Sequence, residues 1–81
     1  MIYVDEQKIK QNGINIGENI RKIRKSKKVG QTALSRNLEL MGIPMTREAL
    51  VKIERGVQHI QAIQLKGIKE ALGTTYDELF G

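Results

Sequence analysis

The sequence predicts an all-α fold, a compact domain of five short helices around a single core. Apolar residues recur three and four positions apart through most of the chain, which is the spacing of helices that bury one face. Glycines and the one proline fall between these periodic segments, where helices end. With 81 residues and no cysteine, the chain has the length for one small core and no disulfide to support it. We therefore expect helices alone after residue 13, and no strand.

Residues 1–14 are expected to form an N-terminal arm, ahead of a helical domain at residues 15–81. The arm lacks helical periodicity, and Asn12-Gly13 is a turn signal. Ile2 and Val4 alternate with other residue types, which is also typical of a short strand. We favour a loosely ordered arm. The alternatives that stay open are a short strand that pairs in a dimer and an arm that contacts phosphates.

The first helix is expected from Ile16 to about Lys28. Asn15 precedes it as an N-cap, and Glu18, three positions later, completes a capping box. Cationic residues in the last turn suit the negative end of the helix dipole. The residues expected to face the core are Ile16, Ile20 and Ile23.

The second helix is expected to begin at Gly30 and to stop at Gly42. Pro44 prevents it from continuing, because proline lacks the backbone N–H that a helix requires. Three apolar side chains are expected on its buried face: Leu34, Leu38 and Met41.

The third helix is expected from Thr46, its N-cap, to Gly56. At about 100° per residue, its side chains separate into two faces. The inward face consists of Ala49, Leu50 and Ile53. The outward face, an arc of roughly 140° by the same geometry, consists of Arg47, Glu48, Val51, Lys52 and Arg55.

The fourth helix is expected from about Ala62 to Leu72, with Gly73 as its stop. Gln61 is a poor cap for its start, although Ile60 can pack on Leu65 as a hydrophobic staple. Its inward residues are expected to be Leu65, Ile68 and Leu72.

A last helical turn is expected after Thr75, which with Glu78 matches a second capping box. Its three apolar residues are expected in the core: Tyr76, Leu79 and Phe80.

Basic residues exceed acidic ones by 14 to 9, which gives a net charge of +5 and a pI near 9.8. Such an excess indicates a polyanionic partner. The aromatic content of 4% argues against a protein that stacks single-stranded bases on rings. Six of the cations lie close together before the second helix: Arg21, Lys22, Arg24, Lys25, Lys27 and Lys28.

The second and third helices, joined by a tight turn, are typical of the motif that inserts its second helix into the major groove of DNA. The outward face of the third helix has suitable chemistry for reading base edges. Arg47 can donate two hydrogen bonds to guanine, and Lys52 can contact guanine or a phosphate. Val51 can pack on a thymine methyl group. Glu48 can accept from cytosine, or it can be structural, through the helix dipole and a pair with Lys52.

The segments NIRKIRKSKKVGQTAL, TREALVKIERG and IKEALGTTYDELF resemble the helix-turn-helix domain of Cro and lambda-type phage repressors, also called the xenobiotic-response-element family. The resemblance covers residues 15–80, nearly the whole chain. It implies a five-helix DNA-binding domain that acts as a homodimer on palindromic operators in double-stranded DNA.

The resemblance also implies roles for individual residues. Arg24 and Glu54 match a family pair that forms a structural salt bridge between the first and third helices. The residues expected to read bases are Arg47, Glu48, Val51 and Lys52. Gln31 and Thr46 match phosphate-contacting positions, and with three nearby cations they form the expected phosphate-binding set: Gln31, Thr46, Arg55, Lys27 and Lys28.

The chain departs from the family pattern at a few positions. Gly30 replaces the usual hydroxyl cap of the second helix, and Ser35 and Lys69 occupy positions where the family prefers alanine. The Lys69 stem is expected to carry its amine to the surface. The segment 39–45 is about one helical turn longer than in the shortest relatives, which affects the angle between the two motif helices.

We therefore predict a cytoplasmic, sequence-specific DNA-binding transcriptional regulator of bacterial or phage type, and specifically a repressor. No cofactor is expected, and His59 without any cysteine provides no usual zinc site. The sequence offers no nucleophile–base set for an enzyme and no apolar run that spans a membrane.

The alternative function is a protein-interaction module of the same fold, such as an antitoxin-like partner or a transcription coactivator. Its protein partner would bind an apolar patch near Ile60, Ile63, Tyr76 and Phe80. The same patch is equally compatible with a homodimer interface or with core.

Overall fold

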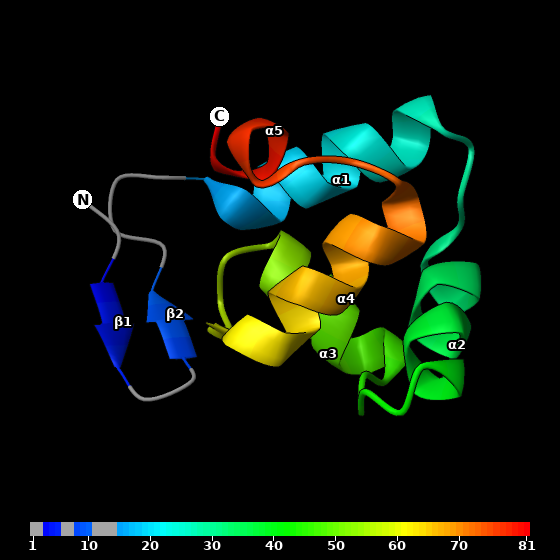
Figure 1. Cartoon of the computed structure of the whole chain (residues 1–81), viewed down its shortest axis with the longest axis horizontal. Helices are drawn as coiled ribbons and strands as arrows, with labels where there is room; N and C mark the ends of the chain where they lie inside the picture. The colour runs from blue at the N-terminus through cyan, green and yellow to red at the C-terminus, as the bar shows by residue number, and fades with distance from the viewer. Residues whose placement is uncertain (1–2, 6–7, 11–14) are drawn as a thin grey trace.

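Five helices surround one apolar core, and three short strands lie beside them (Figure 1). The computed structural model describes residues 3–5, 8–10 and 15–81. The predicted five-helix fold is confirmed, and the boundaries lie within two residues of those expected. The elements, in order, are β1 (Tyr3–Asp5), β2 (Lys8–Lys10), α1 (Ile16–Ser26), α2 (Gln31–Leu40), α3 (Arg47–Glu54), β3 (Ile60–Gln61), α4 (Ala62–Leu72) and α5 (Tyr76–Phe80).

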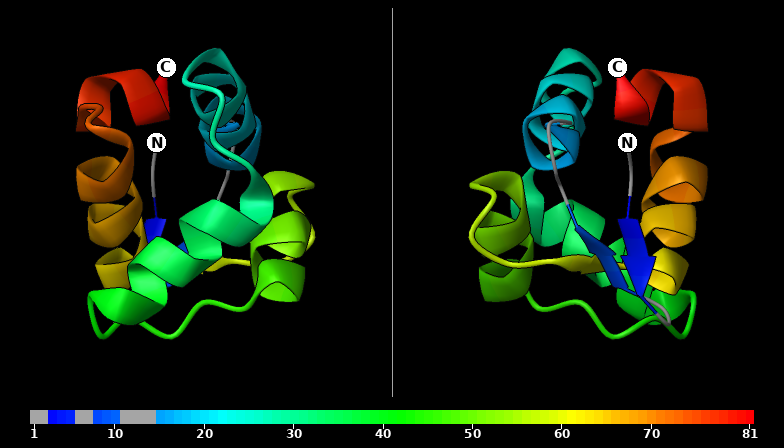
Figure 2. Two further views of the ribbon diagram at one scale, coloured as in Figure 1. Left: turned by 90° about the vertical axis from the view of Figure 1, so that its right-hand side faces the viewer. Right: turned by 90° about the vertical axis from the view of Figure 1, so that its left-hand side faces the viewer.

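The three strands form one antiparallel sheet in the order β1-β2-β3. Val4 pairs with Ile9, and Ile9 pairs in turn with Ile60, so the sheet connects the start of the chain to the segment between α3 and α4 (Figure 2). The expectation of no strand after residue 13 was therefore wrong. A two-residue strand is too short to show a period of two, and β3 exists because β2, distant in sequence, supplies its hydrogen bonds. The boundary of an arm at residue 14 stays a prediction, and the turn signal Asn12-Gly13 lies outside the described residues.

The core consists of apolar side chains from all five helices and from the segments that join them. α1 packs against α3, α4 and α5, while α2 packs against α3 and α4. Every inward residue expected on the third and fourth helices lies in this core or packs against it. The buried apolar residues are Ile16, Ile20, Leu34, Leu38, Ile43, Met45, Leu50, Ile53, Ile60, Leu65, Ile68, Leu72 and Leu79.

Two residues expected in the core are exposed instead. Met41 is 42% exposed, because α2 ends at Leu40 and the chain turns before the next helical position is reached. Ile43 enters the core in its place. Tyr76 is 40% exposed at the first position of α5, where its ring stacks on Phe80 with 6.1 Å between centroids.

The helix caps agree with the sequence signals fully in α3, in part in α5, and not in α1 or α4. Thr46 Oγ1 accepts the backbone N–H of Ala49 at 3.0 Å, as a capping threonine should. The capping box expected at Asn15 does not form, because the Asn15 side chain donates to the Glu18 carboxylate at 2.9 Å. α4 is better capped than expected, since the backbone N–H of Gln61 donates to Gln64 Oε1 at 2.9 Å.

At α5, only the threonine half of the expected box is present. The backbone N–H of Glu78 donates to Thr75 Oγ1 at 3.1 Å. The Glu78 carboxylate instead accepts from the Thr74 hydroxyl at 2.6 Å, and this bond holds the pKa of Glu78 below its usual value.

Ser35 and Lys69, at positions where the resemblance predicts alanine, are both accommodated. Ser35 is buried, and its hydroxyl donates to the carbonyl of Thr32 at 3.0 Å. Lys69 is partly buried, and its amine lies 5.1 Å from the centre of the Tyr76 ring, a cation–π contact at the surface.

Gly17 brings α1 unusually close to α3. A Cβ atom at this position would overlap the carbonyl oxygen of Ile53 and lie 3.0 Å from Glu54 Cα. Both obstacles are backbone atoms, so a larger residue can be accommodated only if the helices move apart.

We expect Gly17→Ala to lower the free energy of unfolding by about 1–3 kcal/mol, the usual cost of overpacking. Urea unfolding measures this change. Gly30→Ala is the matched control, because a Cβ there meets nothing within 4 Å, and its effect should stay within about 0.5 kcal/mol. Equal effects of the two substitutions would contradict the close contact between α1 and α3.

Candidate nucleic-acid interface

The outer face of α3 is the candidate site, and its inner face holds it in place. Leu50 and Ile53 are fully buried, and Ala49 packs against the core from the same side. On the outer face, Val51 is partly buried and the polar residues are exposed: Arg47, Glu48, Lys52 and Arg55. The helix thus has the apolar back and varied polar front that reading a DNA groove requires.

The first turn of α3 presents three groups to solvent. Thr46 uses an oxygen lone pair for its cap, so its hydroxyl proton stays available to donate to a phosphate. Arg47 and Glu48 follow as exposed residues. Within residues 15–81, Glu48 and Lys52 form no ion pair with each other, so the structural role considered for Glu48 lacks that contact. The base-reading set stays a prediction.

A buried ion pair joins α1 to the end of α3. Arg24 Nε donates to Glu54 Oε2 at 2.8 Å and a second guanidinium nitrogen donates to Oε1 at 3.0 Å, the two-bond geometry that orients both groups. The two side chains are only 8% and 2% exposed. Arg24 also donates to the carbonyl of Val29 at 3.0 Å. The expected pair is therefore present, and it sets the position of α3 against α1.

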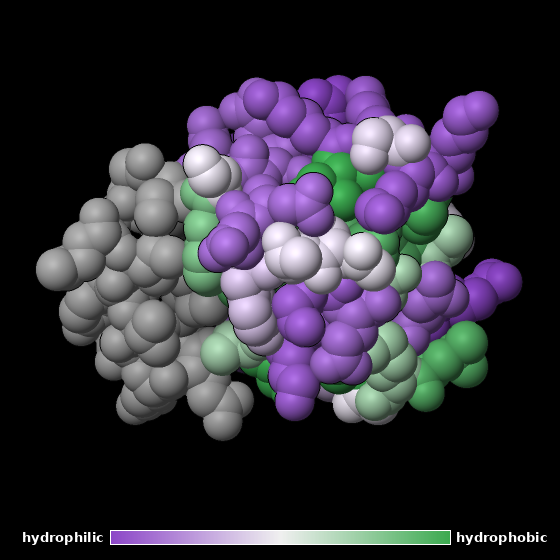
Figure 3. All heavy atoms as spheres, turned by 45° about the horizontal axis from the view of Figure 1, so that its top comes forward, coloured by the Kyte–Doolittle hydropathy of each residue, from purple (hydrophilic) through white to green (hydrophobic). Residues whose placement is uncertain are grey.

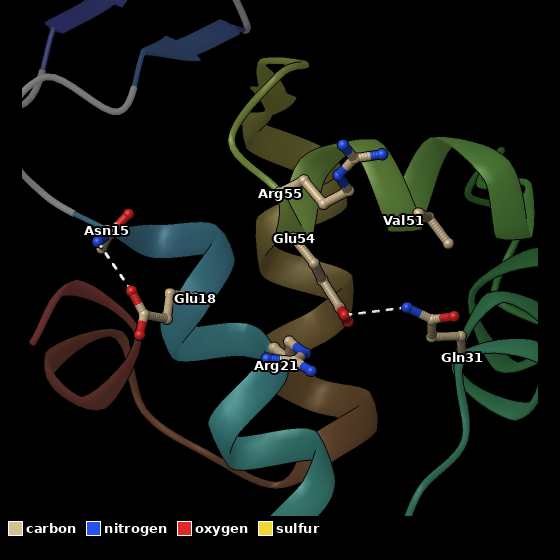
Figure 4. Close-up of a pocket in the computed structure, with 7 residues that line it drawn as sticks. All are labelled: Asn15, Glu18, Arg21, Gln31, Val51, Glu54 and Arg55. Atoms are coloured by element: carbon tan, nitrogen blue, oxygen red, sulfur yellow. Dashed lines mark hydrogen bonds between the residues drawn. The ribbon is translucent and has the colours of Figure 1, made fainter.

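Gln31 belongs to the same network. Its Nε2 donates to Glu54 Oε1 at 3.1 Å (Figure 4). An amide nitrogen carries two protons, so one stays available for a phosphate while Glu54 holds the other. Gln31 thus has a fixed orientation at the start of α2, and its contact with a phosphate stays a prediction.

The remaining phosphate candidates are exposed cations, of which only Arg55 lies at an end of α3. Lys27 and Lys28 lie in the turn that leads from α1 to α2, and Arg55 caps the C-terminal end of α3. Hydrophilic side chains cover much of the face shown in Figure 3, on which apolar residues gather only in small groups. The phosphate contacts of these cations stay predictions.

An open groove of about 530 Å³ lies between α1, the start of α2 and the outer face of α3. Figure 4 shows the residues that line it: Asn15, Glu18 and Arg21 from the α1 side, Gln31 from α2, and Val51, Glu54 and Arg55 from α3. Arg21 is absent from the residues expected at the site. Its position in a cluster of six cations was a signal, but the sequence alone does not show which of the six faces α3.

The apolar patch expected for a protein partner is smaller than the sequence indicated. Ile60 is fully buried and Phe80 packs against the core, so neither offers an open apolar face. Ile63 and Tyr76 are 44% and 40% exposed, and together with Ala62 and Lys66 they line a shallow groove.

The described residues contain neither a metal-binding cluster nor a membrane-spanning helix. No group of three acidic or histidine side chains among them is arranged to bind a metal ion. None of the described helices has the length and apolar character to cross a membrane. His59 is an exposed residue of the loop after α3.

Comparison with solved structures supports the fold. The restriction-modification controller protein C.AhdI from Aeromonas hydrophila superimposes with a TM-score of 0.68 over 83% of this chain and 94% of that protein, at 25% sequence identity. Comparisons with protein-family models and with curated protein sequences gave no match. The chain therefore has a helix-turn-helix domain of the predicted fold, shared with a controller protein.

Proposed function

We propose that this protein is a sequence-specific DNA-binding transcriptional regulator of bacterial or phage type that reads the major groove with α3. The observation that carries the proposal is the division of α3: a buried apolar back, and an outer face on which Arg47, Glu48 and Lys52 are exposed. The buried bond from Arg24 and the partly buried bond from Gln31, both to Glu54, give this helix one fixed position. A helix that reads bases needs such rigidity, because a base contact depends on placement to within a fraction of an ångström.

The likeness to a restriction-modification controller supports a regulatory role. We further propose that the protein acts as a repressor in the cytoplasm. Two copies would place two α3 helices in successive major grooves about 34 Å apart and block access to the DNA between them. The operator would then be palindromic, because its symmetry follows that of the dimer.

Selection of bound sequences from a random pool of DNA duplexes tests this function. We expect a palindromic consensus whose half-sites lie one helical turn apart, with affinity that falls linearly as the logarithm of salt concentration rises. Recovery of no duplex above background would refute the proposed function. An enriched but asymmetric sequence would instead retain DNA binding and refute the two-fold operator.

The groove formed by Ile63 and Tyr76 is the surface that we propose for the homodimer. It presents two large apolar side chains to solvent, and its lining residues belong to α4 and α5, none of them to α3. Exposed apolar side chains that lie together mark association sites more often than isolated ones do.

Ile63→Glu is therefore expected to convert the dimer into a monomer, because each interface would receive two buried carboxylates near its two-fold axis. Sedimentation equilibrium measures the change. Val57→Glu is the control: Val57 is 66% exposed but does not line this groove. A dimer that survives Ile63→Glu would place the interface elsewhere on the molecule.

A further inference from the structure

The groove between α1 and α3 contains two arginines that form no ion pair within residues 15–81. Arg21 projects from α1 and Arg55 from the end of α3, and both line the groove (Figure 4). Within residues 15–81, neither guanidinium takes part in an ion pair or a side-chain hydrogen bond. Two cations that share a groove without a partner repel each other, so an anion between them is favourable.

The carboxylates of the same groove are already engaged. Glu54 accepts from Arg24 and from Gln31, and its side chain is 2% exposed. Glu18 accepts from the Asn15 amide at 2.9 Å and lies 3.5 Å from the Lys22 amine. Their charges are therefore balanced by other groups, and the open part of the groove is positive.

The groove is also continuous with the face proposed to meet DNA. Val51 and Arg55 belong both to the groove and to the outer face of α3, and Gln31 lines the groove at the start of α2. If α3 is seated in the major groove of DNA, a backbone phosphate beside it would therefore lie within reach of the residues that line this groove of the protein. Arginine is well suited to bind such a phosphate, since a guanidinium can donate two parallel hydrogen bonds to phosphate oxygens.

We propose that this groove seats one phosphate of the DNA backbone, so that Arg21 extends the duplex contact from α3 onto α1. Arg55 donates from the opposite wall, and the remaining Nε2 proton of Gln31 donates from the third side. The inference rests on the proposed function, because it specifies which backbone contact accompanies the reading of bases.

Arg21→Gln tests this contact, with Lys25→Gln as the matched control. Both substitutions remove one positive charge from α1, but Lys25 neither lines the groove nor pairs with the Glu18 carboxylate that does. The probe is the duplex selected by the wild-type protein, and affinity is measured by fluorescence anisotropy between about 50 and 200 mM salt. Arg21→Gln should reduce the slope of log affinity against log salt by about 0.9 per protomer. Lys25→Gln should change the slope far less, and circular dichroism should show both variants folded.

Single methylphosphonate substitutions in the duplex separate a direct contact from a structural effect. One neutral linkage per half-site should weaken the wild-type protein more than Arg21→Gln, because that variant keeps only the contacts of Arg55 and Gln31 with the same phosphate. The proposal is overturned if every linkage affects the two proteins equally, or if Arg21→Gln and Lys25→Gln change the salt slope alike.

Inorganic phosphate distinguishes a site for the DNA backbone from a site for a free anion. We expect millimolar phosphate to shift the thermal midpoints of the wild type and Arg21→Gln equally. Stabilisation of the wild type alone, with equal duplex binding by both proteins, would assign the groove to a free anion and overturn our inference. If the wild type selects no duplex at all, the proposed function itself fails, and that result is recognisable before any variant is made.

Discussion

Reversing two charges on α3, in the double variant Arg47→Glu with Lys52→Glu, is expected to lower duplex affinity more than about a hundredfold. Loss of one good two-bond arginine–guanine contact costs about 1–3 kcal/mol, and a symmetric dimer loses it in both half-sites. Each 1.4 kcal/mol is a tenfold change, and repulsion between the new carboxylates and DNA phosphates adds to the loss. Fluorescence anisotropy with the selected duplex measures the effect.

The fold should tolerate this double variant, since both residues are exposed and neither forms an ion pair within residues 15–81. The variant with Lys22→Glu and Lys25→Glu changes the net charge equally from α1 and is the control for long-range electrostatics. A similar loss of affinity in both double variants would mean that overall charge, and not the outer face of α3, determines binding. Retention of affinity for a protein partner after loss of DNA binding would favour the interaction-module alternative.

Glu54→Ala is expected to destabilise the protein by about 3–5 kcal/mol, the usual cost of breaking a buried ion pair. The substitution leaves the Arg24 guanidinium buried with the Val29 carbonyl as its remaining acceptor, and it also removes the acceptor of Gln31. An unpaired charge in a buried position is costly because water no longer solvates it. Urea unfolding measures the loss as a lower midpoint at constant slope.

The double variant Arg24→Met with Glu54→Leu separates the cost of the unpaired charge from the contribution of the pair. Apolar residues of similar size often replace a buried ion pair at little cost, so we expect this variant to be more stable than Glu54→Ala. If it is less stable, the ion pair itself contributes net stability. If Glu54→Ala costs less than about 1 kcal/mol, as exposed ion pairs do, the pair is more hydrated than its burial indicates.

The sequence predicted well the features that depend on neighbouring residues. The apolar period located all five helices, and α4 begins and ends where expected, at Ala62 and Leu72. The caps at Thr46 and Thr75 form because each hydroxyl lies three residues before the N–H that it accepts. Even these local rules failed where a side chain had another partner. The Asn15 side chain, for example, donates to the Glu18 carboxylate and does not accept a backbone N–H of the helix.

Local sequence patterns did not predict the contacts between segments that are distant in the sequence. The pair between Arg24 and Glu54 was expected only through the family resemblance, because no local pattern relates residues 30 positions apart. Gln64 illustrates the same point: its side chain caps α4 through Gln61 and also donates to the Pro44 carbonyl at 3.1 Å. Only the packed structure brings these groups together.

The amino-acid sequence by itself determined where the helices lie and which side of each is apolar. It also determined that the outer face of α3 is polar and varied. All three features follow from the spacing at which apolar residues recur along the chain. The tertiary structure decided that β2 pairs with β3, that Ile60 is buried while Tyr76 is exposed, and that Arg21 and Arg55 share one groove. Those outcomes depend on how close the helices pack and at what angle, which is set by contacts such as that of Gly17 with Ile53. Periodicity contains no information about such distances.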